Sequence, residues 1–436
     1  YTRKILFTGN DITQDHVLRR EMRQFEGAWT SDNAIEAGKV RLERLGYFKE
    51  VNVETIPVPG TDDQIDISYS VEEETTGSIG GNIGYSDFGL MLGFNLQEQN
   101  FLGSGNTVGI GINKNVYSEM YNISYMNPYA TRDGVSLGYN LYFRETDYGE
   151  FNVANYLTNS SGFGAQFGYP ISDITRLGFN ITYDKTDIDI GSLPAREIYD
   201  FVSVEGNIFE TLSAQLSWQR VTLNRGLFPT DGASTVLSVS STIPGSDLSY
   251  YRLNVRQRYY QPLTQNLVFG FQGELGYLDA YGDTEETPFF QNFYAGGPRS
   301  LRGFESNTLG PRSTDAPCYE FNYAEGTCPN LLDTDGDGEL DAPYYNPYAN
   351  QTSRYRDAPI GGNIKIEGSL QLIFRLPFIE DQRSLRSAFF FDFGNVFSDN
   401  CKDYQINCSE PSVDDLRYSY GVGLTWITGF GPMSLA

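Results

Sequence analysis

The sequence lacks the long apolar runs of a helical membrane protein. Its 436 residues hold no stretch of the roughly 18 consecutive apolar residues that a membrane-spanning helix needs. Hydrophobic residues make up 39% of the chain, and the mean hydropathy is -0.39. A helical membrane protein is therefore excluded.

Basic residues and histidine are also scarce. Lys and Arg total 31 against 56 Asp and Glu, which gives a formal net charge of -25 at pH 7. Nucleic acid is therefore not expected as a partner, because phosphate binding needs basic stripes. The one histidine, His16, lies near the amino end and cannot serve as a base elsewhere in the chain, so we predict that the protein is not an enzyme.

Cysteine is rare and falls into two local pairs, Cys318 with Cys328 and Cys401 with Cys408. Each pair lies in a polar stretch that resembles a loop. We expect two short disulfides, which imply an oxidising compartment such as the periplasm or the cell surface. Free or metal-binding thiols are the alternative, but no histidine lies near either pair. Such a compartment requires a signal peptide and none is present, so we expect a mature chain or an internal fragment.

Aromatic residues and glycine are abundant instead. Aromatics reach 14%, with 31 Tyr and 29 Phe, and 46 Gly are spread along the chain. This profile is typical of many short strands with aromatic girdles, as in outer-membrane barrels of Gram-negative bacteria. In such barrels each strand hides its apolar half from a hydropathy scan by alternation.

Residues 1–74 predict one compact α/β domain with a modest core. Apolar residues recur there first at strand spacing, then at helix spacing, and then at strand spacing again. The expected elements are a strand at 4–8, a helix that Thr13 can cap, a second helix from Ser31 or Asp32 to Gly46, and two strands around Pro59-Gly60.

Residues 75–436 alternate instead, with no convincing helix-period segment. Between 363 and 376, apolar residues occupy one face and polar residues the other, so that one side suits lipid and the other water. A soluble sandwich also alternates, but it does not need so many tall strands with aromatic ends. The fold class that we predict is a transmembrane antiparallel β-barrel preceded by one small α/β domain.

The strand count is odd. About fifteen strands are expected, whereas single-chain bacterial barrels close with an even number. The last segment, 431–436, stops after a few strand residues. We therefore expect that an intact barrel has about sixteen strands and that its last part is missing from this sequence.

The connections between strands alternate between short and long. Short turns such as 131–134 and 230–232 are expected on the periplasmic side. The longest connection, the loop 283–361, is then extracellular. A disordered loop of this length is unusual in a compact protein, so we predict a structured and functional loop.

That loop contains Arg302-Gly303-Phe304, preceded by Gly296-Gly297-Pro298. The run resembles the conserved arginine-glycine-phenylalanine motif in the sixth extracellular loop of the Omp85 superfamily. The runs 228–232 and 391–397 resemble the same family, and 45–48 resembles the POTRA module that precedes such barrels. The resemblance covers essentially the whole chain. It implies a factor that folds and inserts β-barrel proteins into the outer membrane. Such proteins carry several POTRA domains, so one domain fits an amino-truncated chain.

The resemblance also implies a latch inside the barrel. Arg302 is expected to reach from the loop into the lumen and to contact Asp392 and an inward residue of the strand after the loop. That residue is Gln371 here, where some relatives have glutamate, so a hydrogen bond would replace a charge pair, and Glu367 or Glu274 could compensate. Gly303, Phe304 and Gly394 complete the two motifs, and a Cys318–Cys328 disulfide is a feature of some relatives. The alternative is that Arg302 only decorates a surface loop.

The loop also carries an acidic run with the oxygen-ligand spacing of a calcium loop. Its candidate ligands are Asp333, Asp335, Asp337, Glu339 and Asp341, with Gly338 at the sixth position. Position 12 is Tyr344 rather than the usual bidentate glutamate. A calcium site of modest affinity and a solvated acidic turn both remain open.

The first barrel strand holds four glycines, Gly77, Gly80, Gly81 and Gly84. Glycines weaken side-chain packing and leave backbone hydrogen bonds available. We hypothesise a lateral seam at which an incoming strand pairs with this edge by β-augmentation. The alternative is that the glycines relieve barrel curvature.

Barrel insertion requires no cofactor, so Ca²⁺ is the only one considered. The partners implied are unfolded outer-membrane proteins, periplasmic lipoprotein subunits of an assembly complex, the lipid bilayer and lipopolysaccharide. The expected location is the outer membrane, with the POTRA domain in the periplasm. A secretion pore of the same superfamily is the alternative function and usually has an amino-terminal plug helix. A passive porin would lack both the POTRA module and the loop motif.

Overall fold

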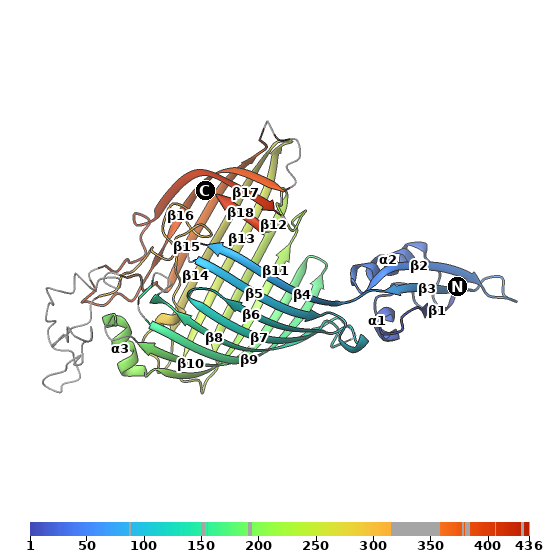
Figure 1. The fold of residues 1–436 in the computed structure, drawn as a ribbon, viewed down its shortest axis with the longest axis horizontal. Coiled ribbons are helices and arrows are strands. Elements are labelled where there is room, and N and C mark those ends of the chain that lie inside the picture. The colour runs from blue at the N-terminus through green and yellow to red at the C-terminus, as the bar shows by residue number, and fades with distance from the viewer. Residues whose placement is uncertain are drawn as a thin grey trace.

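The chain folds into a small amino-terminal domain and a large barrel (Figure 1). A computed structural model describes residues 1–86, 89–131, 133–149, 153–154, 156–190, 194–314, 358–376, 379, 384–405, 407–428 and 431–435. Within these ranges, no helix is long and apolar enough to cross a membrane. We call residues 1–74 the front domain, the barrel end that carries it the near end, and the opposite end the far end.

The front domain has the five elements that the sequence predicts. They are β1 (Thr2–Thr8), α1 (Asp15–Arg19), α2 (Asp32–Arg44), β2 (Phe48–Pro57) and β3 (Ile65–Glu73). The sheet order is β1-β3-β2, with β1 parallel to β3 and β2 antiparallel to it. Leu18, Leu42, Ile67 and Tyr69 are fully buried between the helices and this sheet. Burial raises the pKa of Tyr69 to about 12, and its hydroxyl donates to the carbonyl of Ile35 at 2.9 Å.

The predicted ends of α2 are correct, but the predicted cap of α1 is wrong. Ser31 is the N-cap of α2, and Gly46 follows the helix with a φ of +69° that favours glycine. The N-cap of α1 is Gln14 and not Thr13. Thr13 is buried, and its Oγ1 accepts a hydrogen bond from Nδ2 of Asn100 at 2.8 Å. Its hydroxyl therefore contacts the barrel rather than the first turn of the helix.

The barrel wall is a single antiparallel sheet of fifteen described strands in chain order. This confirms both the predicted fold class and the count of about fifteen. The strands are β4 (Gly77–Ser86), β5 (Gly89–Glu98), β6 (Thr107–Lys114), β7 (Ser118–Asn127), β8 (Ser136–Asp147), β9 (Tyr156–Ser172), β10 (Thr175–Ile190), β11 (Ile208–Val221), β12 (Gly232–Thr242), β13 (Tyr250–Thr264), β14 (Leu267–Ala280), β15 (Ile364–Phe374), β16 (Leu385–Phe397), β17 (Arg417–Thr428) and β18 (Gly431–Leu435).

Alternation along the strands sorts side chains as expected. Leu370 and Leu372 of β15 are exposed on the outer face, and Phe389 and Phe391 of β16 are exposed beside them. Residues one position away in the sequence, such as Ser369 and Asp392, face the lumen. Among the described residues, three short helices lie in the connections: η1 (Phe101–Gly103) at the near end, and α3 (Arg196–Glu205) and η3 (Phe289–Gln291) at the far end.

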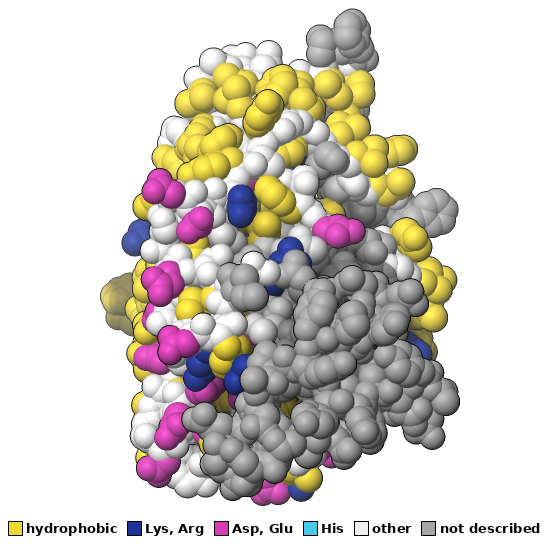
Figure 2. Space-filling view, turned by 90° about the vertical axis from the view of Figure 1, so that its left-hand side faces the viewer, with side chains coloured by type: hydrophobic (Ala, Val, Ile, Leu, Met, Phe, Trp, Pro, Cys, Tyr) yellow, Lys and Arg dark blue, Asp and Glu magenta, His cyan; other side chains and the backbone are white. Residues whose placement is uncertain are grey.

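The long connection between β14 and β15 is folded in its described parts, as predicted. Residues 281–314 and 358–363 are held by isolated bridges such as Phe293 with Gly362 and Ala295 with Leu309. Leu301 and Leu309 pack with Leu278 and Val396 in a buried cluster. The remaining residues, 315–357, lie outside the described part. With them lie Cys318, Cys328 and the acidic run 333–341. Figure 2 looks onto the far end, where Asp and Glu side chains are scattered and hydrophobic side chains lie toward the periphery.

Candidate functional site: a loop latched inside the barrel

Arg302 lies inside the barrel and forms an ion pair with Asp392 of β16. Its Nε and Nη2 donate to the two carboxylate oxygens, each at 2.7 Å, and its backbone N–H donates to Oδ2 at 3.1 Å. The Asp392 side chain is 0% exposed and that of Arg302 is 15% exposed. The two parallel bonds form the bidentate geometry that makes arginine–carboxylate pairs strong and directional.

Two further contacts surround the Arg302 guanidinium. Its carbon lies 3.6 Å from the centre of the Phe390 ring, within the range of a cation–π interaction. Its Nη2 also donates to Oγ of Ser369 at 2.9 Å. Arg302 therefore joins the loop to two neighbouring strands of the wall, and it is a buried latch rather than a surface decoration.

The turn that precedes Arg302 is fixed by a second set of contacts. Ser300 Oγ accepts a hydrogen bond from the N–H of Gly296 at 2.9 Å and donates to the carboxylate of Glu367. The Nζ of Lys365 lies 3.0 Å from the same carboxylate. Leu301 is fully buried between these polar groups and the loop core. The turn is therefore anchored to β15 on one side of the arginine and to β16 at the arginine itself.

Glycines allow the loop and the wall to approach closely. Gly303, directly after the arginine, has a φ of +86°, and Gly394 of β16 has a φ of +156°. A Cβ added at Gly394 would lie 2.3 Å from the carbonyl oxygen of Ile366 on the neighbouring strand, so no side chain fits there. Phe304 packs against the buried loop cluster. Each glycine of the two motifs thus stands where the backbone requires it.

The structure changes the predicted partners on β15. Arg302 was expected to contact Gln371, but its described partner on β15 is Ser369. Gln371 instead donates to Ser369 Oγ at 3.2 Å. Glu367 binds Ser300 and Lys365, as described above. Glu274 accepts from Asn254 at 2.9 Å and from Arg256 at 3.2 Å. Among the described contacts, neither Glu367 nor Glu274 therefore replaces the expected charge pair with Arg302, because each carboxylate binds other residues.

Ser369 was missed because a serine on the polar face of a strand carries no signal of its own. Strand register supplies that signal, since Ser369 is paired directly with Asp392 across β15 and β16. A side chain reaching Asp392 from the lumen therefore meets Ser369 as well.

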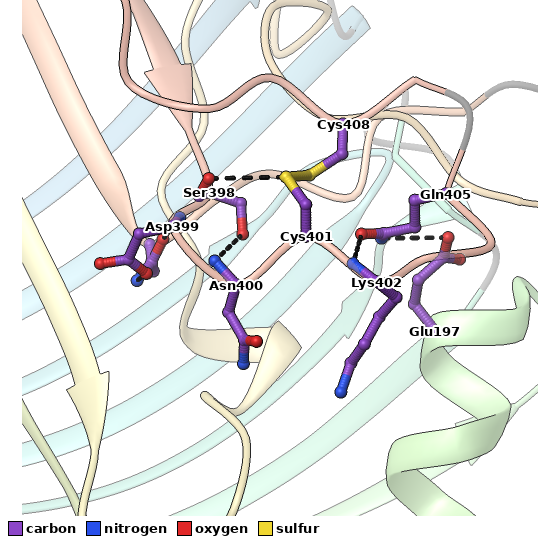
Figure 3. The surroundings of a disulfide bond; sticks show 9 residues. Glu197, Ser398, Asp399, Asn400, Cys401, Lys402, Gln405 and Cys408 are labelled. Atoms are coloured by element: carbon purple, nitrogen blue, oxygen red, sulfur yellow. Dashed lines mark hydrogen bonds between the residues drawn. A yellow bond between two sulfur atoms is a disulfide. The ribbon is translucent and has the colours of Figure 1, made fainter.

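At the far end, the Cys401–Cys408 disulfide closes a small loop between β16 and β17 (Figure 3). This confirms the second predicted pair. Within the loop, Gln405 Nε2 donates to Glu197 of α3 at 3.2 Å, and the Tyr404 hydroxyl donates to Asp200 at 2.7 Å. Glu197 also accepts the N–H of Thr314, and burial raises the pKa of its carboxyl. Glu197 thus joins both the disulfide loop and Thr314 of the long loop to α3.

At the near end, the front domain is docked onto two turns of the barrel. The Tyr47 hydroxyl donates to the carbonyl of Gln99 at 3.1 Å, and the N–H of Gln14 donates to the carbonyl of Gly103 at 2.9 Å. Arg41 Nη2 lies 3.1 Å from the hydroxyl of Tyr129. Sequence reasoning could not find this interface, because its residues are far apart in the chain and those of the barrel belong to ordinary turns.

We expect Arg41→Met to weaken this docking by about 1–3 kcal/mol. Arg41 Nη2 donates to Glu21 at 2.7 Å, and the Glu21 side chain is only 5% exposed. The loss stays moderate because Arg20 still lies 3.7 Å from Glu21. Hydrogen exchange around Tyr129, in the connection between β7 and β8, should become faster, whereas the exposed Arg44→Met should leave it unchanged. Equal exchange in both variants would contradict the role of the ion pair.

The four glycines of β4 meet a different environment from Gly394. A Cβ added at Gly77, Gly80 or Gly84 would lie 2.9, 2.5 or 3.1 Å from the end of the Glu98, Asn95 or Met91 side chain. At Gly81 the nearest atom would be 3.9 Å away. In the described sheet, β4 pairs only with β5, and it stands at one end of the strand order with β18 at the other. Packing within the described barrel therefore does not require glycine along this edge.

These features define an antiparallel membrane barrel with an α/β domain docked at one end and a long loop latched inside the lumen by an arginine–aspartate pair. The model of the Omp85 superfamily domain matches residues 100–436, and a POTRA model described as a surface antigen variable number repeat matches residues 1–74. The chain belongs to the Omp85 superfamily.

Individual relatives support the same assignment. The outer membrane protein assembly factor BamA of Neisseria meningitidis is 29% identical over 465 residues, covering 100% of this chain and 54% of the relative. The chain thus spans about half the length of that curated relative. A crystal structure of BamA from Haemophilus ducreyi lacking POTRA domains 1–3 matches with a TM-score of 0.79 and 31% identity, covering 100% of this chain and 80% of that one. CdiB from Escherichia coli matches at 13% identity with a TM-score of 0.56, covering 97% and 69%, and shares the fold alone.

Proposed function

We propose that this chain is the barrel and adjoining POTRA portion of an outer-membrane protein assembly factor, which folds and inserts β-barrel proteins into the outer membrane. The observation that carries the proposal is the β4 edge, whose glycines meet only flexible side-chain ends or open space. An edge with little side-chain packing is suited to exchange one strand partner for another. The similarity to BamA proteins supports the same function.

The proposed mechanism involves no covalent chemistry and no cofactor. The β4 backbone offers its N–H and C=O groups to an incoming strand. The latched loop meanwhile holds β15 and β16 of the barrel wall in position. Ile79, Ile83 and Tyr85 project from β4 with exposed fractions of 75%, 75% and 84%. Such side chains offer cross-strand contacts to an apolar partner strand. The substrates are then unfolded outer-membrane proteins, which carry their own lipid-facing residues.

The proposed setting follows from this mechanism. The barrel spans the outer membrane, in contact with the lipid bilayer and lipopolysaccharide, and the front domain lies in the periplasm. Lipoprotein subunits of an assembly complex would bind on the periplasmic side. There β1 and β2 form the two edges of the front-domain sheet.

Refolding of a urea-denatured barrel protein into liposomes tests the function. We expect faster folding in liposomes that carry the protein than in empty ones, and a smaller acceleration with Arg302→Ala. The competing function is a secretion pore of the same superfamily. No acceleration by the wild-type protein would favour that pore and refute an assembly factor.

We expect Gly81→Val to slow substrate folding several-fold while leaving the barrel as stable as the wild type or slightly more stable. A Cβ at this position meets no atom closer than 3.9 Å, and a β-branched residue favours the strand conformation. The variant therefore tests the seam at the β4 glycine where an added Cβ has the most room. Gly93→Val is an unsuitable control, because its Cβ would lie 2.1 Å from Asn82. Ala165→Val, on the distant strand β9, is the matched substitution, and equal rates in both variants would refute the seam.

We also propose that the acidic run 333–341, outside the described residues, binds one Ca²⁺ ion of modest affinity. The alternation of carboxylates with a glycine at the sixth position supports this site. Calorimetric titration of the wild type should give a dissociation constant of roughly 10⁻⁴–10⁻³ M. Asp335→Ala should abolish the heat. Absence of binding to the wild type at millimolar calcium would leave a solvated acidic turn.

A further inference from the structure

A cavity opens at the near end of the barrel, away from the Arg302–Asp392 latch. Its volume is about 650 Å³, which lies within the usual range for small-molecule sites. Its described lining comes from the adjoining ends of β13, β14, β15 and β16 and from residues of the β11–β12 and β13–β14 connections. Phe228 and Pro229, from one of the family-like motifs, form part of its wall.

Three arginines line this cavity, and no described lining residue is acidic. They are Arg225, Arg375 and Arg386. In a chain with a formal charge of -25, such a group of cations creates a local field that attracts anions. Arg225 lies between β11 and β12, Arg375 directly follows β15, and Arg386 lies in β16, so the fold brings Arg225 together with the other two.

Arg386 is the central cation of the group. Its guanidinium carbon lies 4.9 Å from the centre of the Tyr260 ring and 5.9 Å from that of Phe228. One terminal nitrogen, Nη2, is buried and has no hydrogen-bond partner among the described residues. A buried guanidinium nitrogen without an acceptor is costly, and an incoming anion would supply that acceptor.

The other lining residues are partly apolar and partly uncharged polar, the latter being Thr230, Thr264, Gln265 and Asn266. Val268 and Ile373 are buried with Tyr260 and Ala388 in one cluster, and the former two line the cavity together with Leu385. Phe228, whose φ of +49° is rare for a bulky residue, also lines the cavity. A ligand therefore meets both cations and an apolar surface.

The orientation of these side chains determines from where a ligand can enter. Val268, Ile373 and Arg386 project to the same face of the wall as Asp392, whereas their neighbours Phe269, Leu372 and Phe389 project outward. Arg386, Val268 and Ile373 are therefore reached from the aqueous lumen, whereas Phe374 and Leu385, which also line the cavity, follow the outward parity of Leu372 and Phe389.

We propose that this cavity is a binding site for an amphiphilic anion that arrives from the aqueous side, with one acidic group on Arg386 and an apolar body against Phe228 and Ile373. The proposal does not depend on the assembly function, because it concerns a separate cavity and is tested by binding alone.

The probe is 3-phenylpropionate, with 3-phenylpropanamide as its neutral counterpart. Both are titrated by saturation-transfer NMR against the protein in nanodiscs of zwitterionic lipid. The wild type should bind the carboxylate about tenfold more tightly than the amide, as one charge-assisted hydrogen bond predicts. Equal affinities for the two probes would overturn the proposal.

Variants locate the site. Arg386→Gln should remove the preference for the carboxylate over the amide. Phe228→Ala should weaken the binding of both probes to the same extent. Arg258→Gln is the matched control, since Arg258 also projects into the lumen from β13 but does not line the cavity. Thermal unfolding shows whether Arg386→Gln is folded, and the exposed Arg225→Gln, expected to weaken the carboxylate several-fold, provides a second test. A loss in Arg258→Gln equal to that in Arg386→Gln would refute the site.

Discussion

Asp392→Ala should destabilise the barrel by about 3–5 kcal/mol and release the loop from the wall, because it leaves Arg302 buried without its counter-ion. All three described hydrogen bonds between the two residues end on the Asp392 carboxylate. The free energy of unfolding in urea measures the first effect, and protease cleavage near residue 302 measures the second. Ser369→Ala, which removes a single hydrogen bond to the same guanidinium, should cost only about 1 kcal/mol.

A double variant separates the contribution of the latch to stability from its contribution to substrate folding. Replacing both members of a buried ion pair by apolar residues is often nearly neutral, so Arg302→Met combined with Asp392→Leu should regain most of the stability lost in Asp392→Ala. Substrate folding should remain slow in the double variant if the ion pair governs the position of the loop. Stability in the double variant as low as in Asp392→Ala would show that packing, and not an unpaired charge, causes the loss.

The sequence predicted most of the fold because alternation and helix spacing are local signals. Residues 363–376 alternate so regularly that their inward and outward faces were correct at every described position that the latch uses. The contact between Arg302 and Asp392 followed from a motif and from the parity of one strand. What could not be predicted depends on pairing between strands and on contacts between distant turns. Ser369 needs the register with Asp392, and Thr13 needs Asn100, 87 residues away.

The arginine cavity shows the same limit. Arg225 lies 150 residues before Arg375 and 161 before Arg386 in the sequence. Their approach depends on the order of the strands β11 to β16 in the sheet. Local patterns therefore identify strands and the faces of strands, whereas sites that combine several turns become visible only in three dimensions.

Two glycine positions provide the sharpest comparison between packing and flexibility. Gly394→Ala should cost about 2–5 kcal/mol, the sum of an unfavourable backbone conformation and a forced shift of the neighbouring strand. Its added Cβ would lie 2.3 Å from the Ile366 carbonyl oxygen and 2.9 Å from Cα of Glu367, and backbone atoms cannot move aside as a side chain can. Because Glu367 holds Ser300 of the loop turn, that shift should also loosen the latch.

Gly81→Ala is the matched control for this substitution. The same methyl group is added to a barrel strand, but the nearest atom is 3.9 Å away, so stability should be unchanged or should rise by about 0.5–1 kcal/mol. Urea unfolding of both variants in the same lipid measures the difference. A large difference in stability would show that Gly394 is required for close packing and that the glycines of β4 are not. The assembly rate of Gly81→Val then tests what the β4 glycines are required for. Equal stabilities would remove the packing argument, because β15 and β16 would then have room that the structure does not show.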